Sequence, residues 1–163
     1  MKKILSVIVV VVVTLTQTAQ ITAFAQETDK PAVNAQACVL YCVDDGKVYF
    51  SVNENKKMKT ASTTKLMTSL ITLEYADSAD KVVAFTKDMT AEGSSMYLKV
   101  GEKVKLSDLA AGMMMASGND AANAAAISIA GSAEKFSELM NNRAAVIGMK
   151  NTHFVTPSGL DDE

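Results

Sequence analysis

Two short motifs contain the side chains best suited to covalent chemistry. Ser62 lies three positions before Lys65, and the run Ser117-Gly118-Asn119 follows further along the chain. A serine hydroxyl is a poor nucleophile at neutral pH and needs a base. A lysine can be that base when burial or a neighbouring cation lowers its pKa. The motifs therefore predict a serine nucleophile activated by lysine, with a second serine for proton relay and an amide for substrate binding.

A helix is the element that must position the first pair. Residues three apart on a helix lie on one face, about one turn from each other, so Lys65 can reach the hydroxyl of Ser62. Ser62 then lies at the helix N-terminus, where the dipole favours negative charge and its own N–H is a candidate oxyanion donor. The stretch 66–73 is apolar around most of its circumference, which predicts a buried helix. A lysine in such a helix requires polar partners.

Strand signals come before and after this helix. An Asp-Asp-Gly turn between the strand-like runs 37–43 and 47–52 indicates a hairpin. Two further short strands are expected at 82–85 and 96–100. These strands are too few to complete a sheet.

Helix signals dominate the second half of the chain. Ser107, Asp120 and Ser132 are the expected N-caps, because their side chains can accept hydrogen bonds from free N–H groups. Gly131 and Gly148 are expected to end the second and third of these helices. Together the elements predict a mixed α/β (α+β) domain with helices packed on an antiparallel sheet.

The first 25 residues have the form of a secretory signal peptide, with a positive start, an apolar stretch and a small-x-small cleavage site ending at Ala25. The alternative, a membrane anchor, needs about 20 apolar residues, and this stretch is shorter. We expect cleavage of 1–25, a flexible lead-in over 26–36 and a single domain over 37–163. The mature chain then has 14 basic and 18 acidic residues, a net charge of −4.

Several other kinds of site are excluded. The mature chain has no basic stripe, so nucleic acid is not an expected partner. Cys38 and Cys42 would lie about 13 Å apart on one strand, too far for a mutual disulfide, and are expected to be small buried hydrophobic residues. His153 is the only histidine, which leaves no metal site, and it is expected to have a structural hydrogen-bonding role. No cofactor is predicted.

The two motifs together match the S-x-x-K and S-D/G-N pair of penicillin-recognising serine enzymes. From about Ala37 to Asp161 the chain resembles low-molecular-mass penicillin-binding proteins that act as serine-type D-Ala-D-Ala carboxypeptidases. The matching segments are ASTTKLMT at 61–68, GSSM at 93–96, MMASGNDAA at 114–122, and NTHF and PSGLD within 151–161.

The resemblance implies a role for each residue of the motifs. Ser62 would be acylated by the penultimate D-Ala of a peptidoglycan stem peptide, with Lys65 as its general base. Ser117 would relay a proton to the leaving D-Ala, and Asn119 would bind the peptide amide and position the lysine, with Gly118 beside them in the substrate site. Water would then hydrolyse the acyl-enzyme. β-Lactams would imitate the substrate and leave a slowly released adduct.

The chain departs from the family pattern in two places. Thr60 stands where proline often precedes Ala-Ser, and the third family motif, Lys-(Ser/Thr)-Gly, does not occur before Glu163. We therefore expect a truncated, amino-terminal part of the carboxypeptidase, which would lack the completing strand and any carboxy-terminal segment that associates with the membrane. Export would place the enzyme in the cell envelope, at the outer face of the cytoplasmic membrane.

Two alternatives remain open at this point. A class A β-lactamase shares the S-x-x-K nucleophile, but such enzymes have aspartate where Gly118 stands and a deacylating glutamate in an E-x-x-L-N segment, which does not occur in this chain. The second alternative is a non-catalytic module that binds peptidoglycan or senses β-lactams.

Overall fold

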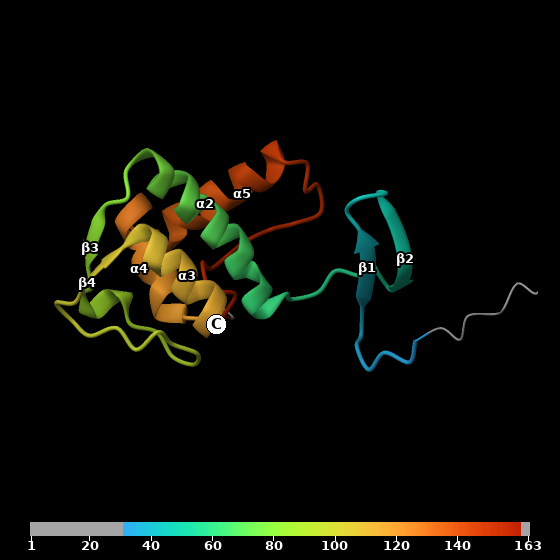
Figure 1. The fold of residues 1–163 in the computed structure, drawn as a ribbon, viewed down its shortest axis with the longest axis horizontal. Helices are drawn as coiled ribbons and strands as arrows, with labels where there is room; N and C mark the ends of the chain where they lie inside the picture. The colour runs from blue at the N-terminus through green and yellow to red at the C-terminus, as the bar shows by residue number, and fades with distance from the viewer. Residues whose placement is uncertain (1–30, 161–163) are drawn as a thin grey trace, which may run out of the picture. The chain divides into compact units, whose positions relative to one another are not determined.

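The structure, a computed structural model, describes residues 31–160 of the chain. The expected signal peptide and the first part of the expected lead-in lie outside the described residues. The chain divides into two compact units, Met1–Lys56 and Lys57–Glu163 (Figure 1). Each unit contains a small antiparallel sheet, and the helices that the structure describes all belong to the second unit.

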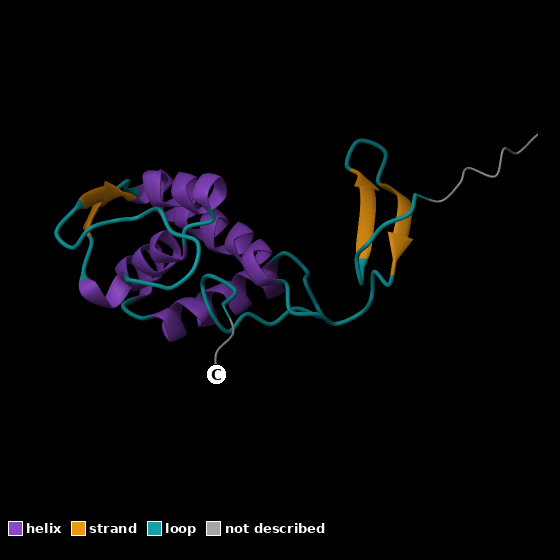
Figure 2. Ribbon diagram, turned by 90° about the horizontal axis from the view of Figure 1, so that it is seen from below, coloured by secondary structure: helices purple, strands orange, loops and turns teal. Residues whose placement is uncertain are grey.

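The first unit contains the predicted hairpin. Strands β1 (Cys38–Cys42) and β2 (Lys47–Val52) pair antiparallel (Figure 2). The register shifts between Leu40 and Tyr41, so β2 contributes one more residue than β1 at this point, as in a β-bulge. The prediction of two strands around an Asp-Gly turn is confirmed.

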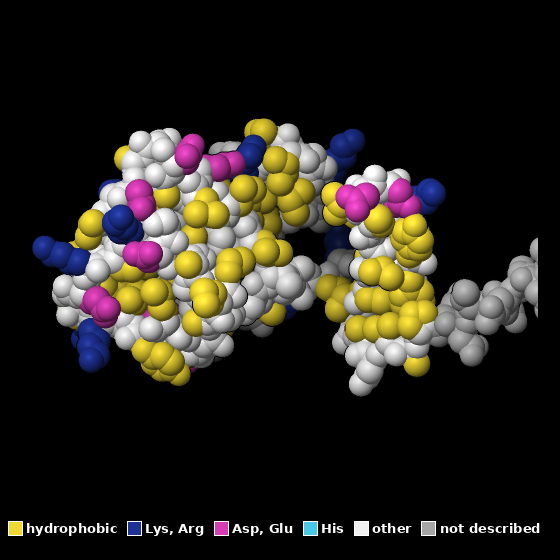
Figure 3. Space-filling model, viewed as in Figure 1, with side chains coloured by type: hydrophobic (Ala, Val, Ile, Leu, Met, Phe, Trp, Pro, Cys, Tyr) yellow, Lys and Arg dark blue, Asp and Glu magenta, His cyan; other side chains and the backbone are white. Residues whose placement is uncertain are grey.

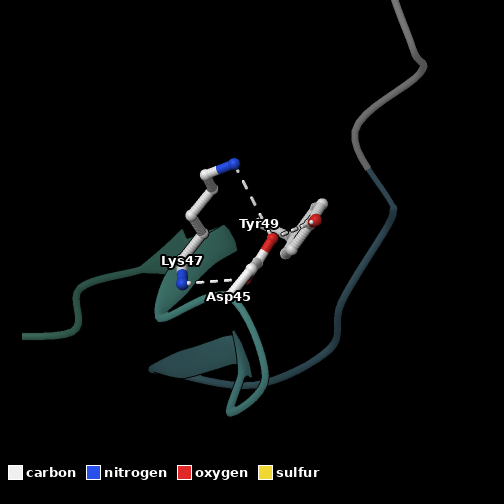
Figure 4. Close-up of polar contacts among 3 residues, drawn as sticks. All are labelled: Asp45, Lys47 and Tyr49. Atoms are coloured by element: carbon white, nitrogen blue, oxygen red, sulfur yellow. Dashed lines mark hydrogen bonds and ion pairs between the residues drawn. The ribbon is translucent and has the colours of Figure 1, made fainter.

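A single carboxylate holds the hairpin turn. Gly46 has a left-handed backbone, with φ of +69°, which glycine adopts without steric strain. Asp45 accepts hydrogen bonds from the Tyr49 hydroxyl at 2.7 Å and from the Lys47 N–H at 3.0 Å (Figure 4). The Tyr49 hydroxyl first, and then the Lys47 N–H, hold the pKa of the Asp45 carboxyl below its usual range.

The two cysteines lie at opposite ends of β1. Both thiols are free, in agreement with the prediction that Cys38 and Cys42 do not pair. Both residues are half-buried rather than buried, so the expectation that they are buried hydrophobic residues is wrong. A hairpin of two strands has no second layer of its own to cover them.

The second unit is built mainly from helices. Its elements in chain order are η1 (Ala61–Thr64), α2 (Lys65–Ser78), β3 (Val82–Ala84), η2 (Lys87–Met89), β4 (Lys103–Lys105), α3 (Leu106–Ala116), α4 (Asn119–Ala130) and α5 (Ala133–Val146). Strands β3 and β4 pair antiparallel at one edge of the helices (Figure 1). Over residues 31–160, no helix combines the length and the apolar content that a membrane crossing requires.

Helix α4 lies at the centre of the second unit and packs against α2, α3 and α5. Short side chains let neighbouring helices approach closely, while larger residues such as Leu109 and Phe136 fill the space beside them. This packing places the start of α4 beside α2, which is where the second motif must lie to meet the first. The fully buried alanines of α4 are Ala121, Ala122, Ala124, Ala125 and Ala126.

The start of α3 differs from the prediction. The helix begins at Leu106, so Ser107 lies inside its first turn instead of at the N-cap. Both the N–H and the hydroxyl of Ser107 donate to Asp80, at 3.0 and 2.8 Å. The Ser107 cap is therefore wrong, because a carboxylate from the loop after α2 accepts these hydrogen bonds.

The other predicted helix ends have mixed outcomes. Gly118 is the N-cap of α4, so the prediction that Asp120 caps this helix is wrong. Ser132 caps α5 as predicted, since its hydroxyl accepts the N–H of Lys135 at 3.2 Å. Gly131 ends α4 with φ of +86°, also as predicted.

The segment 96–100 is a loop, although a strand was expected there. The backbone N–H groups of Met96 and Leu98 donate to the side chain of Asp120 and not to a neighbouring strand. The strand that pairs with β3 is instead Lys103–Lys105, which the sequence pattern did not indicate.

Only one side of α2 is covered by the second unit. Met67 and Ile71 are buried, whereas Leu66 is 63% exposed and Leu70 and Leu73 are also exposed. The exposed residues follow helical spacing and form one apolar face, and hydrophobic side chains are visible over this helix in Figure 3. The prediction of a helix buried on all sides is wrong for the part of the chain that the structure describes.

Candidate active site

Ser62 and Lys65 meet where η1 runs into α2. The Lys65 amine donates to the Ser62 hydroxyl at 3.1 Å, as the three-residue spacing predicts. Ser62 is exposed, whereas Lys65 is only 1% exposed. The hydroxyl is therefore open to an incoming molecule, while the amine that contacts it lies inside the protein.

Three oxygen atoms surround the Lys65 amine. Besides the Ser62 hydroxyl, they are the carbonyl of Ser158 at 3.0 Å and the hydroxyl of Ser117 at 3.5 Å. Within residues 31–160 no carboxylate forms an ion pair with Lys65. Burial lowers the pKa of Lys65 because it disfavours the charged form. A neutral amine has two N–H groups, which match Ser158 and Ser117, and one lone pair, which can face the Ser62 hydroxyl.

The position of Ser117 depends on an unusual backbone conformation. Ser117 ends α3 in the left-handed region, with φ of +52°. This conformation is unfavourable for a non-glycine residue and is found more often at functional sites than elsewhere. It turns the chain between α3 and α4 so that the hydroxyl of half-buried Ser117 reaches the Lys65 amine.

Asn119 follows at the start of α4, and within residues 31–160 no hydrogen bond joins its side chain to Lys65. Its side-chain N–H donates to the Glu92 carbonyl at 2.6 Å, and its backbone N–H donates to the Ser94 carbonyl at 2.8 Å. Its side-chain oxygen is buried and has no hydrogen-bond partner among residues 31–160. Gly118 is buried, and a Cβ there would lie 3.2 Å from the Met96 nitrogen, so this position requires a small residue.

The segment 156–160 is a part of the site that the sequence did not reveal. The Ser158 carbonyl accepts from Lys65, and the neighbouring Pro157 carbonyl accepts from the Thr68 hydroxyl at 2.6 Å. Backbone carbonyls have no sequence signature, and only the resemblance of the PSGLD segment to the family pointed to this region.

Gly159 packs directly against the turn that precedes the nucleophile. Ala61 has φ of +46°, and a Cβ on Gly159 would lie 2.0 Å from the Ala61 carbonyl oxygen. We expect Gly159→Ala to lower the free energy of unfolding by on the order of 2–4 kcal/mol, from steric overlap and from its own left-handed backbone. Urea unfolding followed by circular dichroism measures this loss.

Gly148→Ala is the matched control for that substitution. Gly148 also has a positive φ, of +85°, but a Cβ there would meet nothing within 4 Å. We expect it to lose only about 1 kcal/mol, from backbone strain alone. Equal losses in the two variants would show that Gly159 does not pack tightly against Ala61.

His153 is not part of the group around Lys65. Its side chain is exposed and lines an open cavity of about 480 Å³, together with Lys57 and Thr64. In the described part of the chain no hydrogen bond joins His153 to Ser62 or Lys65. The two motifs thus meet at one corner without a contribution from histidine.

Solved structures of related proteins have the same fold. Penicillin binding protein 5 from Haemophilus influenzae is 33% identical, with a TM-score of 0.74 over 81% of this chain and 41% of that one. Penicillin-Binding Protein D2 from Listeria monocytogenes, solved in its ampicillin-bound form, is 31% identical, with a TM-score of 0.68 over 82% of this chain and 56% of that one. The fold is therefore that of penicillin-binding proteins, and the predicted fold class is confirmed.

Sequence comparison identifies the family. The D-alanyl-D-alanine carboxypeptidase family matches residues 24–163. The D-alanyl-D-alanine carboxypeptidase DacF of Bacillus subtilis is 37% identical over all of this chain and 44% of its own length. The chain belongs to the D-alanyl-D-alanine carboxypeptidase family, as the resemblance implied, and spans less than half the length of that relative.

Proposed function

We propose that the protein is a serine-type D-Ala-D-Ala carboxypeptidase, which removes the terminal D-Ala of peptidoglycan stem pentapeptides. The observation that supports this most directly is the buried Lys65 amine, 3.1 Å from the exposed Ser62 hydroxyl and without a carboxylate partner in the described residues. An amine in this environment favours its neutral form and can act as a base toward the serine.

The proposed reaction has two steps. Lys65 accepts the Ser62 proton as the serine oxygen attacks the carbonyl carbon of the penultimate D-Ala, and the oxyanion that forms is stabilised by the Ser62 N–H. The peptide C–N bond then breaks, Ser117 passes its proton to the departing D-Ala nitrogen, and Lys65 returns the proton it took from Ser62 to Ser117. In the second step water attacks the Ser62 ester and Lys65 accepts a proton from the water. The ester C–O bond then breaks, Lys65 returns the proton to the Ser62 oxygen, and the shortened peptide leaves as a carboxylic acid.

Asn119 and Gly118 complete the proposed substrate site. The side-chain oxygen of Asn119 is buried and has no partner in the described part of the chain, which is unfavourable unless a ligand donates to it. A peptide amide of the substrate supplies such a donor. We propose that Asn119 binds this amide, with Gly118 beside it in the substrate site, where the lack of a side chain lets the backbone pack against Met96.

The setting of the enzyme forms part of the proposal. The signal-peptide form of residues 1–25 supports export to the outer face of the cytoplasmic membrane, where peptidoglycan is accessible. We propose that residues 37–163 belong to the catalytic domain. β-Lactams are proposed as covalent inhibitors that acylate Ser62.

One experiment distinguishes this function from its alternatives. The protein expressed from its complete coding sequence is incubated with a fluorescent penicillin and, separately, with a model pentapeptide that ends in D-Ala-D-Ala. Covalent labelling together with D-Ala release supports the carboxypeptidase. Labelling without release favours a β-lactam-sensing module, and rapid penicillin turnover favours a β-lactamase.

The pH dependence of acylation tests the role of Lys65. We expect the rate of penicillin acylation to rise with pH through the pKa of Lys65, because only the neutral amine can accept the serine proton. The midpoint is expected below the ordinary lysine value of 10.5, since burial disfavours the ammonium. Circular dichroism over the same pH range controls for unfolding. A rate that is independent of pH would contradict Lys65 as the base.

A further inference from the structure

The residue after the second motif, Asp120, has no role in the reaction proposed above, yet its environment is unusual. Its carboxylate is only 3% exposed and accepts four hydrogen bonds. Three of the donors come from the loop 92–98. The four donors are the Ser95 hydroxyl at 2.7 Å and the backbone N–H groups of Met96 at 2.8 Å, Leu98 at 3.1 Å and Ala121 at 2.9 Å.

These contacts keep Asp120 ionised. Burial acts to raise the pKa of the Asp120 carboxyl, but the four hydrogen bonds together outweigh burial and hold this pKa below its usual range. No lysine or arginine forms an ion pair with Asp120 within residues 31–160. The loop donors and the N-terminus of α4 therefore stabilise the charge.

The other end of the same loop holds Asn119. The Glu92 carbonyl accepts the Asn119 side-chain N–H at 2.6 Å, and the Ser94 carbonyl accepts its backbone N–H at 2.8 Å. Gly93 lies against the same amide, because a Cβ on Gly93 would be 3.1 Å from the Asn119 side-chain nitrogen. The loop thus pairs the side-chain nitrogen of Asn119 and leaves its side-chain oxygen to accept a hydrogen bond from a ligand.

The loop is held in a strained conformation. Tyr97 has a left-handed backbone, with φ of +61°, although it is neither glycine nor asparagine. Its N–H donates to the Ser95 hydroxyl at 2.8 Å, and that hydroxyl in turn donates to Asp120. A strained conformation persists only where surrounding contacts enforce it, and here those contacts converge on one carboxylate.

We propose that Asp120 is a positioning residue: it holds the loop 92–98 in the conformation in which the Glu92 and Ser94 carbonyls orient the Asn119 amide for the substrate. This inference rests on the proposed function, because orientation of the amide matters only if the side-chain oxygen of Asn119 binds the peptide. Asp120 acts through Asn119 and does not contact the substrate itself.

Asp120→Asn tests this role with little change in volume. An amide keeps one acceptor oxygen and presents an NH₂ group to backbone donors, so it cannot satisfy all the loop N–H groups. In the protein expressed from its complete coding sequence, we expect kcat/KM for D-Ala release to fall roughly 10- to 100-fold, the scale of a small misplacement at an active site. Hydrogen exchange of the Met96 and Leu98 amides should become faster in the same variant.

A double-mutant cycle separates positioning from general destabilisation. If Asp120 acts through Asn119, adding Asp120→Asn to Asn119→Ala should lower kcat/KM by less than twofold further, because the residue that it positions is already absent. A purely structural role would make the two losses multiply, and that result would overturn the proposal. Full activity of the single variant would also overturn it.

Two further variants complete the test. Asp80→Asn is the matched control, since Asp80 also accepts hydrogen bonds at the start of a helix, from the N–H and the hydroxyl of Ser107. This variant should leave kcat/KM within twofold of the parent enzyme. If Asp120→Asn does not fold, Ser95→Ala removes one of the four bonds, and its smaller loss must likewise vanish in the Asn119→Ala background. Failure of the parent enzyme to label or to release D-Ala would instead refute the proposed function.

Discussion

Ser62→Ala is expected to abolish covalent labelling by fluorescent penicillin and to reduce D-Ala release by roughly 10⁶-fold, the scale seen when a serine nucleophile is removed from an unrelated hydrolase. The methyl group cannot form the ester, and Lys65 then has no proton to accept from it. Gel fluorescence of the labelled protein and a coupled D-Ala assay on the complete protein measure the two losses.

Thr63→Ala is the control for this substitution. Thr63 carries an exposed hydroxyl in the same turn, but this hydroxyl donates to the Thr60 carbonyl and does not contact Lys65. Labelling should persist in that variant. Labelling of Ser62→Ala at another side chain, located by mass spectrometry of its peptides, would refute Ser62 as the nucleophile.

Lys65→Arg is expected to slow acylation by about 10²- to 10⁴-fold, the usual contribution of a general base. Arginine keeps the positive charge and much of the length of lysine, but it stays protonated at any pH at which the protein is folded. It therefore cannot accept the serine proton. The second-order rate constant for penicillin labelling measures the effect, and thermal unfolding shows whether the larger side chain is accommodated.

Lys99→Arg provides the comparison for that variant, because Lys99 is an exposed lysine away from the group around Ser62. Its rate constant should equal that of the parent enzyme. An acylation rate in Lys65→Arg that matches Lys99→Arg would mean that another group removes the serine proton.

The parts of the site that were predictable are side chains close together in sequence. Ser62 and Lys65 are three residues apart in a helical segment, and this spacing determines the distance between their side chains. The apolar residues around Lys65 in the sequence pointed to its burial, which the structure shows. The hairpin followed from its Asp-Gly turn, because glycine is specifically favoured there.

The parts that were not predictable depend on contacts between distant segments. Asp80 and Asp120 each accept hydrogen bonds from a segment more than twenty residues away, so local helix rules misassigned the start of α3 and of α4. The same contacts turn 96–100 from an expected strand into a loop. Helix periodicity also misjudged which side of α2 is covered, because the structure buries the polar Thr68, Ser69 and Thr72 and leaves the apolar leucines at 66, 70 and 73 exposed.

The carbonyl of Ser158, which accepts from the Lys65 amine, belongs to a residue 93 positions further along the chain. A ribosome must therefore synthesise nearly the whole described segment before the base acquires its complete set of acceptors. Until then, a serine exposed on an isolated helix would have a protonated lysine beside it and would react no faster than an ordinary alcohol.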